Sequence, residues 1–304
     1  MKKYKLINNK SSIIKLNFSI KGINIYYKDE NTLDFCFGGN KVRLFEYIAQ
    51  VIINSKAEKV ITFGSCYSNY IRVTSAVCNK LNKKCILIVI GDDRIISPNI
   101  EIAKKYGAEI VYCKKNNAHD FIDEYLKKEN NYIWIPGGGH IKEAVYGYVD
   151  ASKEIEEQRL KLKLNEFDAI FVPCGTGTTQ AGLIYGFSNR KTEIIGTSIA
   201  RKKKRCIDEI SLLLEELNVN FDRKKIIVKE IQNNKYGGSN ERIINSNRAL
   251  LESDQIVLDP IYNSKAFYGM CEYLKKTKKK YKNVLFINTG GNPNVFRNGE
   301  NDEI

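Results

Sequence analysis

The feature that most constrains the fold of this chain is a regular alternation of short apolar runs and amphipathic helical stretches between residues 59 and 135. Strand-like runs lie at 59–63, 85–90, 109–113 and 132–135, and helical patterns near 68–82, 98–106 and 118–129 separate them. Because a helix follows each strand, the strands are expected to run parallel. The sequence therefore predicts a parallel sheet flanked by helices.

A second series follows a long charged helix expected at about 141–164. Its strands are expected at 168–173, 193–198, 225–229 and 283–288, and its helices at 178–188, 205–218, 241–253 and 263–281, while two more strands at 12–18 and 22–28 precede both series. Two such series predict two α/β lobes, each a mostly parallel twisted sheet, with a ligand crevice between them. We assign residues 1–45 plus 152–304 to a large ligand-binding domain and residues 46–151 to a small α/β domain.

Composition argues against several kinds of catalytic site. The chain has two histidines, His119 and His140, so a histidine-based metal site or a Ser-His-Asp triad has little material. Its eight cysteines include no C-x-x-C pair, and most lie within apolar patterns that indicate reduced, buried thiols. We therefore predict no metal site, and chemistry based on a lysine or a cofactor becomes the better explanation.

The net charge of +14 raises the question of a nucleic-acid or membrane partner. The basic clusters at 201–205 and 275–282 have no recognisable nucleic-acid module around them, so we interpret them as a solvated basic face. No apolar run approaches the length of a membrane span, and polar residues interrupt any apolar region near the N-terminus. The expected location is the cytoplasm, without a nucleic-acid or membrane partner.

The stretch Phe37-Gly38-Gly39-Asn40-Lys41 joins a strand-like run to the first turn of an amphipathic helix. Two glycines allow a tight turn and a close approach of the backbone to a bound group. Lys41 is expected to have a lowered pKa, because the positive potential of the helix terminus and a dry site both disfavour its ammonium form. This is the environment of a Schiff-base lysine, although most lysines are solvated surface groups.

A second glycine turn, Gly175-Thr176-Gly177-Thr178-Thr179, follows the strand at 168–173 and opens a helix. Its small residues, helix N–H groups and hydroxyls predict a phosphate cup. The run lacks the lysine of a Walker A motif and the third glycine of a dinucleotide fingerprint. An ordinary strand–helix turn is the alternative.

Other strand ends carry polar groups that could serve the same site. Ser68 and Asn69 lie at a helix N-terminus after the strand at 59–63, where an ordinary N-cap is the alternative. Thr289 follows the last strand and could make one neutral hydrogen bond to a ring, and Tyr262 brings a phenol before a helix. The three glycines at 137–139 indicate a backbone pressed close to another group, or an ordinary turn.

Taken together, these stretches resemble the family of 1-aminocyclopropane-1-carboxylate deaminase and D-cysteine desulfhydrase, which are pyridoxal-phosphate (PLP) enzymes with the fold of the tryptophan synthase β-subunit (PLP fold type II). The resemblance extends from about residue 12 to residue 296. It rests on Gly38-Gly39-Asn40-Lys41-Val42-Arg43, Ser68-Asn69 with Arg72, Gly175 to Gly182, Asp259-Pro260-Ile261-Tyr262 with Lys265 and Gly269, and Thr289-Gly290-Gly291.

The resemblance implies a role for each candidate residue. Lys41 would carry pyridoxal 5′-phosphate as a Schiff base, and Gly175, Thr176, Gly177, Thr178 and Thr179 would bind its phosphate. Asn69 is similar to the residue that bonds the phenolic oxygen of the cofactor, and Thr289 to the partner of its pyridine nitrogen. Ser68 and Tyr262 resemble the catalytic pair that faces the substrate. The substrate-binding set would be Asn40, Tyr67, Ser68, Asn69 and Tyr262.

The implied function is a PLP-dependent carbon–sulfur lyase or deaminase that acts on a small amino acid with a β-leaving group, as D-cysteine desulfhydrase does. Lys41 would remove the α-proton, and Tyr262 or Ser68 would assist the leaving group, giving a 2-oxo acid and ammonia. A neutral Thr289 favours elimination, because it cannot keep the pyridine nitrogen protonated.

A β-replacement synthase, a 1-aminocyclopropane-1-carboxylate deaminase and a non-enzymatic binding protein are the alternatives. Asn263, where the deaminase branch has an acidic residue, argues against opening a cyclopropane ring. The resemblance also implies a homodimer.

Overall fold

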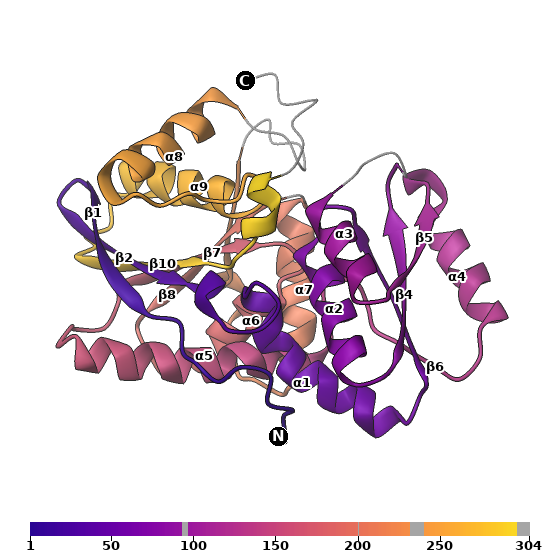
Figure 1. Cartoon of the computed structure of the whole chain (residues 1–304). Helices are drawn as coiled ribbons and strands as arrows, with labels where there is room; N and C mark the ends of the chain where they lie inside the picture. The colour runs from indigo at the N-terminus through magenta and orange to yellow at the C-terminus, as the bar shows by residue number, and fades with distance from the viewer. Residues whose placement is uncertain (93–96, 200, 232–239, 297–304) are drawn as a thin grey trace.

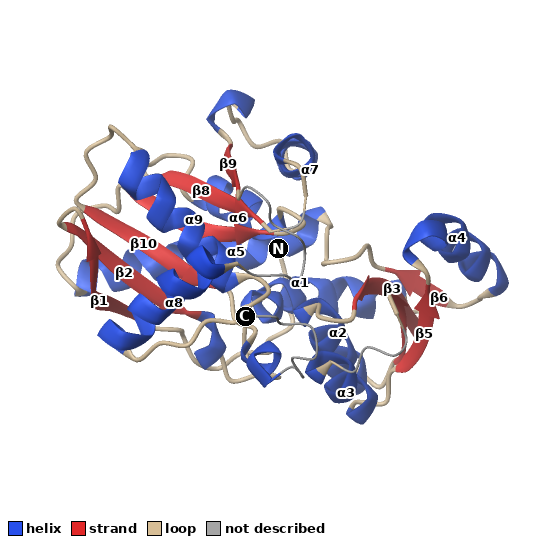
Figure 2. Ribbon diagram, turned by 90° about the horizontal axis from the view of Figure 1, so that it is seen from above, coloured by secondary structure: helices blue, strands red, loops and turns tan. Residues whose placement is uncertain are grey.

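The computed structural model describes residues 1–92, 97–199, 201–231 and 240–296. The chain forms two β-sheets that lie side by side with helices around them (Figure 1). Seen from above, the larger sheet lies to the left and the smaller to the right, with helix α1 (Asn40–Ser55) between them (Figure 2). The expected two-lobed α/β architecture is confirmed.

The larger sheet contains six strands in the order β1-β2-β10-β7-β8-β9. Strands β1 and β2 form an antiparallel hairpin, and every other pairing in this sheet is parallel. Their bounds are β1 (Ile13–Ile20), β2 (Ile23–Asp29), β7 (Ala169–Cys174), β8 (Glu193–Ser198), β9 (Ile227–Glu230) and β10 (Asn283–Asn288). The helices that follow the hairpin and accompany this sheet are α5 (Lys142–Lys161), α6 (Thr178–Gly186), α7 (Lys203–Glu216), α8 (Glu241–Asp254) and α9 (Asn263–Lys276).

The smaller sheet contains four parallel strands in the order β5-β4-β3-β6. Their bounds are β3 (Lys59–Ser65), β4 (Lys84–Ile90), β5 (Glu109–Cys113) and β6 (Tyr132–Trp134), and the helices are α2 (Asn69–Lys80), α3 (Pro98–Lys105) and α4 (Ala118–Lys128). The alternation of apolar strands with helices along the chain therefore produces the parallel sheet that the sequence predicts.

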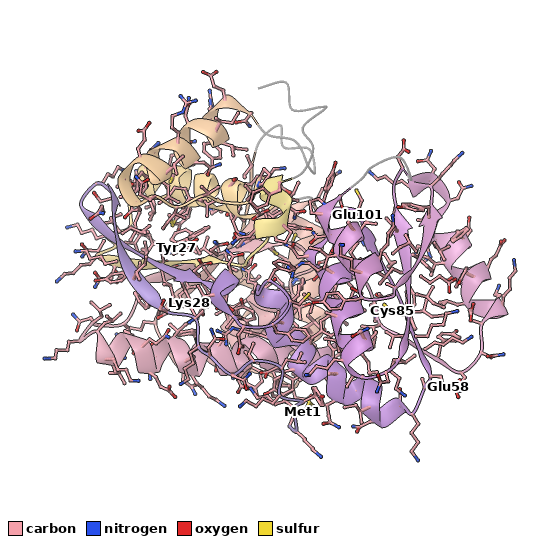
Figure 3. All side chains as sticks on the ribbon, viewed as in Figure 1. Met1, Tyr27, Lys28, Glu58, Cys85 and Glu101 are labelled. Carbon is pink, nitrogen blue, oxygen red and sulfur yellow. The ribbon has the colours of Figure 1, made fainter. Side chains whose placement is uncertain are left out.

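One large apolar cluster draws on both sheets. It includes Val60 and Val89 of the smaller sheet, Ile170 and Leu285 of the larger sheet, and Phe45 of α1. Figure 3 shows side chains filling the space between the ribbons, with Cys85 on β4 and Lys28 on β2 among those labelled. Because these residues pack as one cluster, the two sheets share a core.

Helices α1 and α5 both run across the predicted domain boundaries. The boundary at 45/46 falls within α1 and that at 151/152 falls within α5. The division of the chain into domains at these positions stays a prediction.

One predicted element is too long. The helix expected over 263–281 ends at Lys276, and Thr277 adopts an extended conformation as its C-cap. The following segment is held by other contacts: the Tyr281 hydroxyl donates to Glu193 at 2.5 Å, and the Lys282 N–H donates to Asp168 at 2.7 Å. These contacts bring the chain to the start of β10, which the apolar pattern alone did not reveal. No helix in the described part of the chain has the length and apolar character needed to cross a bilayer.

Candidate active site

A cavity of about 210 Å³ lies at the carboxyl ends of strands β3, β7 and β10. This is small for a ligand site and suits compact ligands. It is lined by Asn40, Lys41, Phe63, Gly64, Ser65, Ser68, Asn69, Gly137, Gly138, Pro173, Gly175, Thr176, Gly177, Thr178, Thr179, Ile199, Arg201, Tyr262 and Thr289. Strand ends from both sheets therefore converge on one cavity, as expected for parallel sheets.

The structure brings together every predicted site residue except Tyr67. Tyr67 is not part of the cavity wall; its ring packs against the apolar cluster that the two sheets share. Its backbone carbonyl accepts hydrogen bonds from Asn99 at 3.0 Å and from Asn294 at 3.1 Å. Tyr67 therefore holds the loop beside Ser68 in place. Its predicted role in binding substrate stays a prediction that the cavity wall does not support.

A strained turn places Lys41 at the start of α1. Residues 36–39 all have positive φ, of 44°, 60°, 63° and 98°, and the first two are not glycines. A Cβ on Gly38 would lie 2.5 Å from the carbonyl oxygens of Glu30 and Asn31, so this position requires glycine. The Asn40 N–H donates to the Thr289 carbonyl at 2.9 Å, which fastens the helix to the end of β10. Strain of this kind is commonly retained at functional sites.

The amine of Lys41 is half-buried within the cavity. Its Nζ donates to the Gly138 carbonyl at 2.9 Å. Burial, and after it the positive charge of Arg201, lower the pKa of Lys41 from its ordinary value to about 8. The lowered pKa expected from the sequence is thus present, but with Arg201 as a second cause. Sequence reasoning missed Arg201, because it counted this residue within a solvated basic cluster.

The glycine–threonine turn forms a neutral cup beside Lys41. Gly177 caps α6 with φ +90° and no side-chain hydrogen bond, so the first turn of the helix faces the cavity without a side-chain cap. The Thr176 and Thr178 hydroxyls lie 3.4 Å apart, and the Asn40 amide donates to the Thr179 hydroxyl at 2.8 Å. This contact places Asn40 on the cup, which supports a phosphate-binding role for it more than the predicted substrate-binding role.

The glycine turn after β6 packs against this cup. A Cβ on Gly138 would lie 2.4 Å from Thr176 Cγ2, so the two loops touch through their backbone and small side chains. The close approach expected from three successive glycines is therefore made to Thr176.

Ser68 and Asn69 lie at the N-terminus of α2 and also line the cavity. Ser68 is the N-cap of α2, with its Oγ accepting from the Tyr70 N–H at 3.2 Å, and it also lines the cavity. Asn69 Oδ1 accepts from the Asn99 amide at 3.2 Å, which orients the Asn69 Nδ2 donor away from Asn99. A Cβ on Gly291 would lie 3.0 Å from that nitrogen. Because Asn69 lines the cavity, this nitrogen can donate to an oxygen there.

Asn99 is a further residue that sequence reasoning missed. It is fully buried, and its amide also donates to Asn294 Oδ1 at 3.1 Å, while its Oδ1 accepts from Arg72 Nε at 3.0 Å. It therefore connects α2, α3 and the segment after β10. No local pattern in the sequence marks it, because its partners are 27 to 195 residues away.

Asp259 holds the backbone of Tyr262, whose side chain lines the cavity. Its carboxylate accepts from the N–H groups of Ile261, Tyr262 and Asn263 at 2.8 to 3.0 Å, while burial raises its pKa. The Asn263 Oδ1 accepts from the Thr289 N–H at 2.9 Å, and the Thr289 hydroxyl lies 3.3 Å from the same oxygen. The hydroxyl donates to this oxygen at the longer distance, so rotation about its C–O bond can turn the proton towards a ligand while the N–H keeps Asn263 paired.

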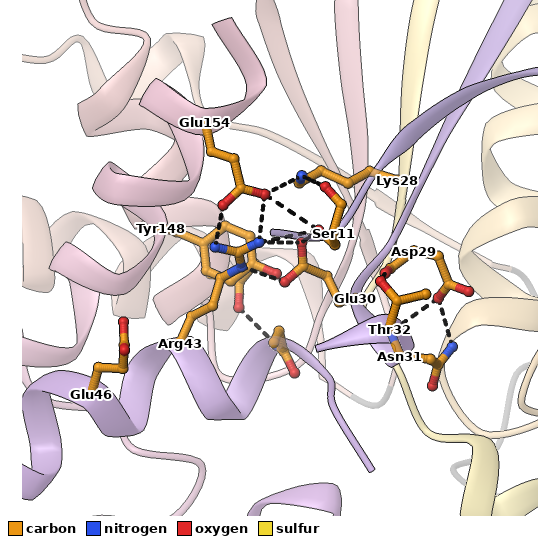
Figure 4. Close-up of polar contacts among 12 residues, drawn as sticks. Ser11, Lys28, Asp29, Glu30, Asn31, Thr32, Arg43, Glu46, Tyr148 and Glu154 are labelled. Carbon is orange, nitrogen blue, oxygen red and sulfur yellow. Dashed lines mark hydrogen bonds and ion pairs between the residues drawn. The ribbon is translucent and has the colours of Figure 1, made fainter. Parts of the chain in front are cut away.

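A buried network of charges anchors the helix that carries Lys41 (Figure 4). Arg43 forms an ion pair with Glu30 and donates to both oxygens of Glu154, at 2.9 and 3.0 Å. Lys28 donates to Glu154 at 2.6 Å and to the Ser11 carbonyl at 2.7 Å. The burial of these side chains means that the network specifies where α1 lies against β2 and α5.

The cavity combines an amine of lowered pKa, an uncapped helix terminus with hydroxyls, and neutral donors at two strand ends. Among the described residues, none that lines it is acidic. Such a set fits a compact ligand that carries both a phosphate and a carbonyl group. The class of protein that this fold and site define is an α/β enzyme whose cavity suits a phosphorylated cofactor beside a lysine.

Comparison with known proteins agrees with that class. Residues 7–290 match the family described as "Pyridoxal-phosphate dependent enzyme". The chain is 31% identical to a "Putative 1-aminocyclopropane-1-carboxylate deaminase" from Pyrococcus furiosus, covering 92% of this chain and 88% of that one. It is 27% identical to a "D-cysteine desulfhydrase" from Yersinia enterocolitica, covering 96% of this chain and 94% of that one. A solved "ACC deaminase homologue" superposes with a TM-score of 0.84 at 29% identity, covering 97% and 93%.

This chain belongs to the family of pyridoxal-phosphate-dependent enzymes. Its cofactor is pyridoxal 5′-phosphate, and the resemblance seen in the sequence is confirmed. The site fits that group, because Lys41 offers an amine for the aldehyde and the cup offers donors for the phosphate. Which residue meets which part of the cofactor remains a proposal.

Proposed function

We propose that the protein is a lyase that eliminates the β-substituent and the amino group of a small amino acid, with D-cysteine as the first substrate to test. The observation that carries the proposal is that the Lys41 amine, the Ser68 hydroxyl and the Tyr262 phenol line one small cavity, whose described wall has no acidic side chain. Relatives named D-cysteine desulfhydrase and 1-aminocyclopropane-1-carboxylate deaminase, which match most of the chain, support the same reaction class.

In the proposed reaction, bound PLP supplies the electron sink that makes the α-proton of the amino acid acidic. Lys41 accepts that proton, since its pKa of about 8 leaves about a tenth of the amine unprotonated at pH 7, far more than the ordinary value would. Tyr262 or Ser68 donates a proton to the departing sulfur. D-Cysteine and water would yield hydrogen sulfide, pyruvate and ammonia.

The remaining site residues would orient the reactants. We assign the cofactor phosphate to Gly175, Thr176, Gly177, Thr178 and Thr179 with Asn40, the phenolic oxygen to the Asn69 amide, and the pyridine nitrogen to the Thr289 hydroxyl. The Asn69 amide is oriented by Asn99, and Thr289 is held by Asn263 through its backbone N–H. The neutral hydroxyl favours elimination, because it leaves the ring nitrogen unprotonated.

One observation bears on the deaminase alternative. The position after Tyr262 carries Asn263, which is fully buried and donates to Asp259 at 2.5 Å and to the Gly290 carbonyl at 2.6 Å. This amide is used in structural hydrogen bonds. It cannot act as the acid that opening a cyclopropane ring requires, so we favour a β-leaving group. We also propose a homodimer located in the cytoplasm, without a nucleic-acid partner.

The test is purification with PLP, a visible absorption spectrum, and a screen of D- and L-amino acids for pyruvate and sulfide. We expect D-cysteine to give both products without a second substrate, and Lys41→Ala to abolish turnover. The exposed Lys80→Ala is the matched control and should retain activity. A protein that releases no pyruvate from an amino acid alone, but forms an exchanged amino acid when a second nucleophile is added, would be a β-replacement synthase. A colourless protein that ignores added cofactor would contradict the proposal.

A further inference from the structure

Among the described residues, Arg201 and Lys41 are the two basic side chains that line the cavity, and no carboxylate lines it. The cup itself is neutral, since it offers backbone N–H groups, hydroxyls and the Asn40 amide. A phosphate monoester carries about −1.5 to −2 charges at pH 7. If Lys41 is committed to the aldehyde, Arg201 is the remaining cation of the wall that could balance the phosphate.

The contacts of Arg201 place it on the side of the cup. Its Nη1 donates to Glu209 Oε1 at 3.3 Å, and Glu209 is followed on α7 by Ile210. A Cβ on Gly177 of the cup would lie 2.7 Å from Ile210 Cγ1. The part of α7 that bears the partner of Arg201 therefore packs directly against the proposed phosphate-binding turn.

The contact with Glu209 holds Arg201 but uses few of its N–H donors. Glu209 is shared with Arg205, at 3.5 Å, and with His140, whose Nε2 lies 2.9 Å from Glu209 Oε2. A guanidinium has five N–H donors, of which the described residues pair one with Glu209. A side chain that is about a quarter exposed and directed into a cavity by one shared carboxylate is arranged to bind an anion.

We propose that Arg201 is the charged anchor of the cofactor phosphate, completing the neutral glycine–threonine cup while Glu209 orients its guanidinium. The proposal requires the cofactor but does not depend on which amino acid is the substrate. It gives one member of the basic cluster 201–205 a role in binding, whereas Arg205 remains on the solvated face with 67% of its side chain exposed.

The test compares PLP with pyridoxal, which lacks the phosphate. Dissociation constants for the full-length apoenzyme would be measured by quenching of the emission of Trp134, whose ring stacks on the cavity residue Phe63 at 5.8 Å. We expect Arg201→Gln to weaken PLP about ten- to a hundredfold more than it weakens pyridoxal, as for loss of a charged hydrogen bond, because pyridoxal reports only the change that Arg201 causes at the Lys41 amine. Arg205→Gln, which loses a charge that also contacts Glu209, should change neither.

A second variant separates an anchor from a structural ion pair. Glu209→Gln keeps an acceptor for Arg201 and removes the competing negative charge, so PLP binding should be unchanged or tighter. Inorganic phosphate should raise the melting temperature of the wild-type apoenzyme and of Glu209→Gln, but not that of Arg201→Gln. Equal loss of PLP and pyridoxal affinity, unchanged PLP affinity in Arg201→Gln, or weakening by Glu209→Gln equal to that of Arg201→Gln would each overturn the proposal. These outcomes are independent of whether any amino acid is turned over.

Discussion

The acid–base behaviour of Lys41 is set by two physical effects that act in the same direction. Burial removes water from the ammonium, and Arg201 adds a like charge nearby, so both favour the neutral amine. A neutral amine can attack an aldehyde or accept a proton, whereas an ammonium can do neither. The reactivity of this residue near neutral pH is therefore a property of its surroundings.

We expect competitive acetylation of the apoenzyme, read by peptide mass spectrometry, to give Lys41 a titration midpoint near pH 8, below its ordinary value of 10.5. Because the folded pKa is lowered, the amine becomes reactive at lower pH in the folded chain than in the unfolded one. The Lys41 peptide of the urea-unfolded protein is the control. In Arg201→Gln the midpoint should move upward, since a repelling charge is removed. A midpoint near 10.5 in the folded wild type would refute this account.

At the scale of single residues, the sequence predicted most of the polar side chains that line the cavity. Lys41, the cup, Ser68, Asn69, Tyr262 and Thr289 follow strand ends or open helices, so local pattern and chain order predicted that they would meet. Arg201 and Asn99 could not be found in this way. Their importance comes from partners brought close by tertiary packing, and nothing in the residues beside them distinguishes them from surface groups.

At the scale of elements, α1 is held by charges rather than by apolar contacts alone. Arg43 lies two residues after Lys41 and pairs with Glu30 and Glu154 in a buried site (Figure 4). Removing one member of such a network leaves the others without compensation, which costs more than the network contributes. The network thus makes the position of the first turn of α1 depend on β2 and α5.

We expect Arg43→Met to lower the free energy of unfolding by about 3–5 kcal/mol, because Glu30 would remain buried without its cation and Glu154 would keep only Lys28. Urea denaturation followed by circular dichroism measures this change. Lys10→Met removes a cation from the exposed pair with Glu157 and should cost less than about 1 kcal/mol. Similar losses in the two variants would show that burial of the network contributes little.

The contact between α5 and α1 depends on Gly147. A Cβ there would lie 2.5 Å from the Arg43 carbonyl oxygen, which belongs to a helix backbone and cannot rotate away. We expect Gly147→Ala to destabilise the protein by about 1–3 kcal/mol, although alanine is the better helix former. Lys153→Ala, on the exposed face of α5, should stay within about 0.5 kcal/mol. A stabilised Gly147→Ala protein would contradict the packing described here.

Boundaries of elements were harder to predict than their order. The order of strands and helices follows from apolar periodicity, but α9 ends at Lys276 and not at residue 281. Its end is decided by contacts of residues 281 and 282 with Glu193 and Asp168, which are about a hundred residues away in sequence. A local pattern cannot include such contacts.

At the scale of the whole molecule, the shared apolar cluster links the two sheets. Because Val60 and Val89 pack in the same cluster as Ile170 and Leu285, neither sheet can unfold without exposing the core of the other. The cavity lies where strand ends from both sheets meet. The integrity of the site is therefore tied to that of the whole chain.

We expect unfolding in urea to be a single transition by two probes. The one tryptophan, Trp134, lies on β6 of the smaller sheet, so its fluorescence reports on that sheet. Far-ultraviolet circular dichroism reports on helices throughout the chain. The two curves should coincide within error. Fluorescence that changes at a clearly lower urea concentration would mean that the smaller sheet unfolds separately.

The acid-free wall of the cavity has a practical consequence for handling the protein. The described wall carries two cationic side chains and no carboxylate, so the pocket attracts small anions from solution. Sulfate or phosphate buffers should therefore occupy the apoenzyme and slow its reconstitution, while a cationic tertiary-amine buffer at low ionic strength should not. The choice of storage salt will decide how readily the protein accepts its vitamin-derived partner.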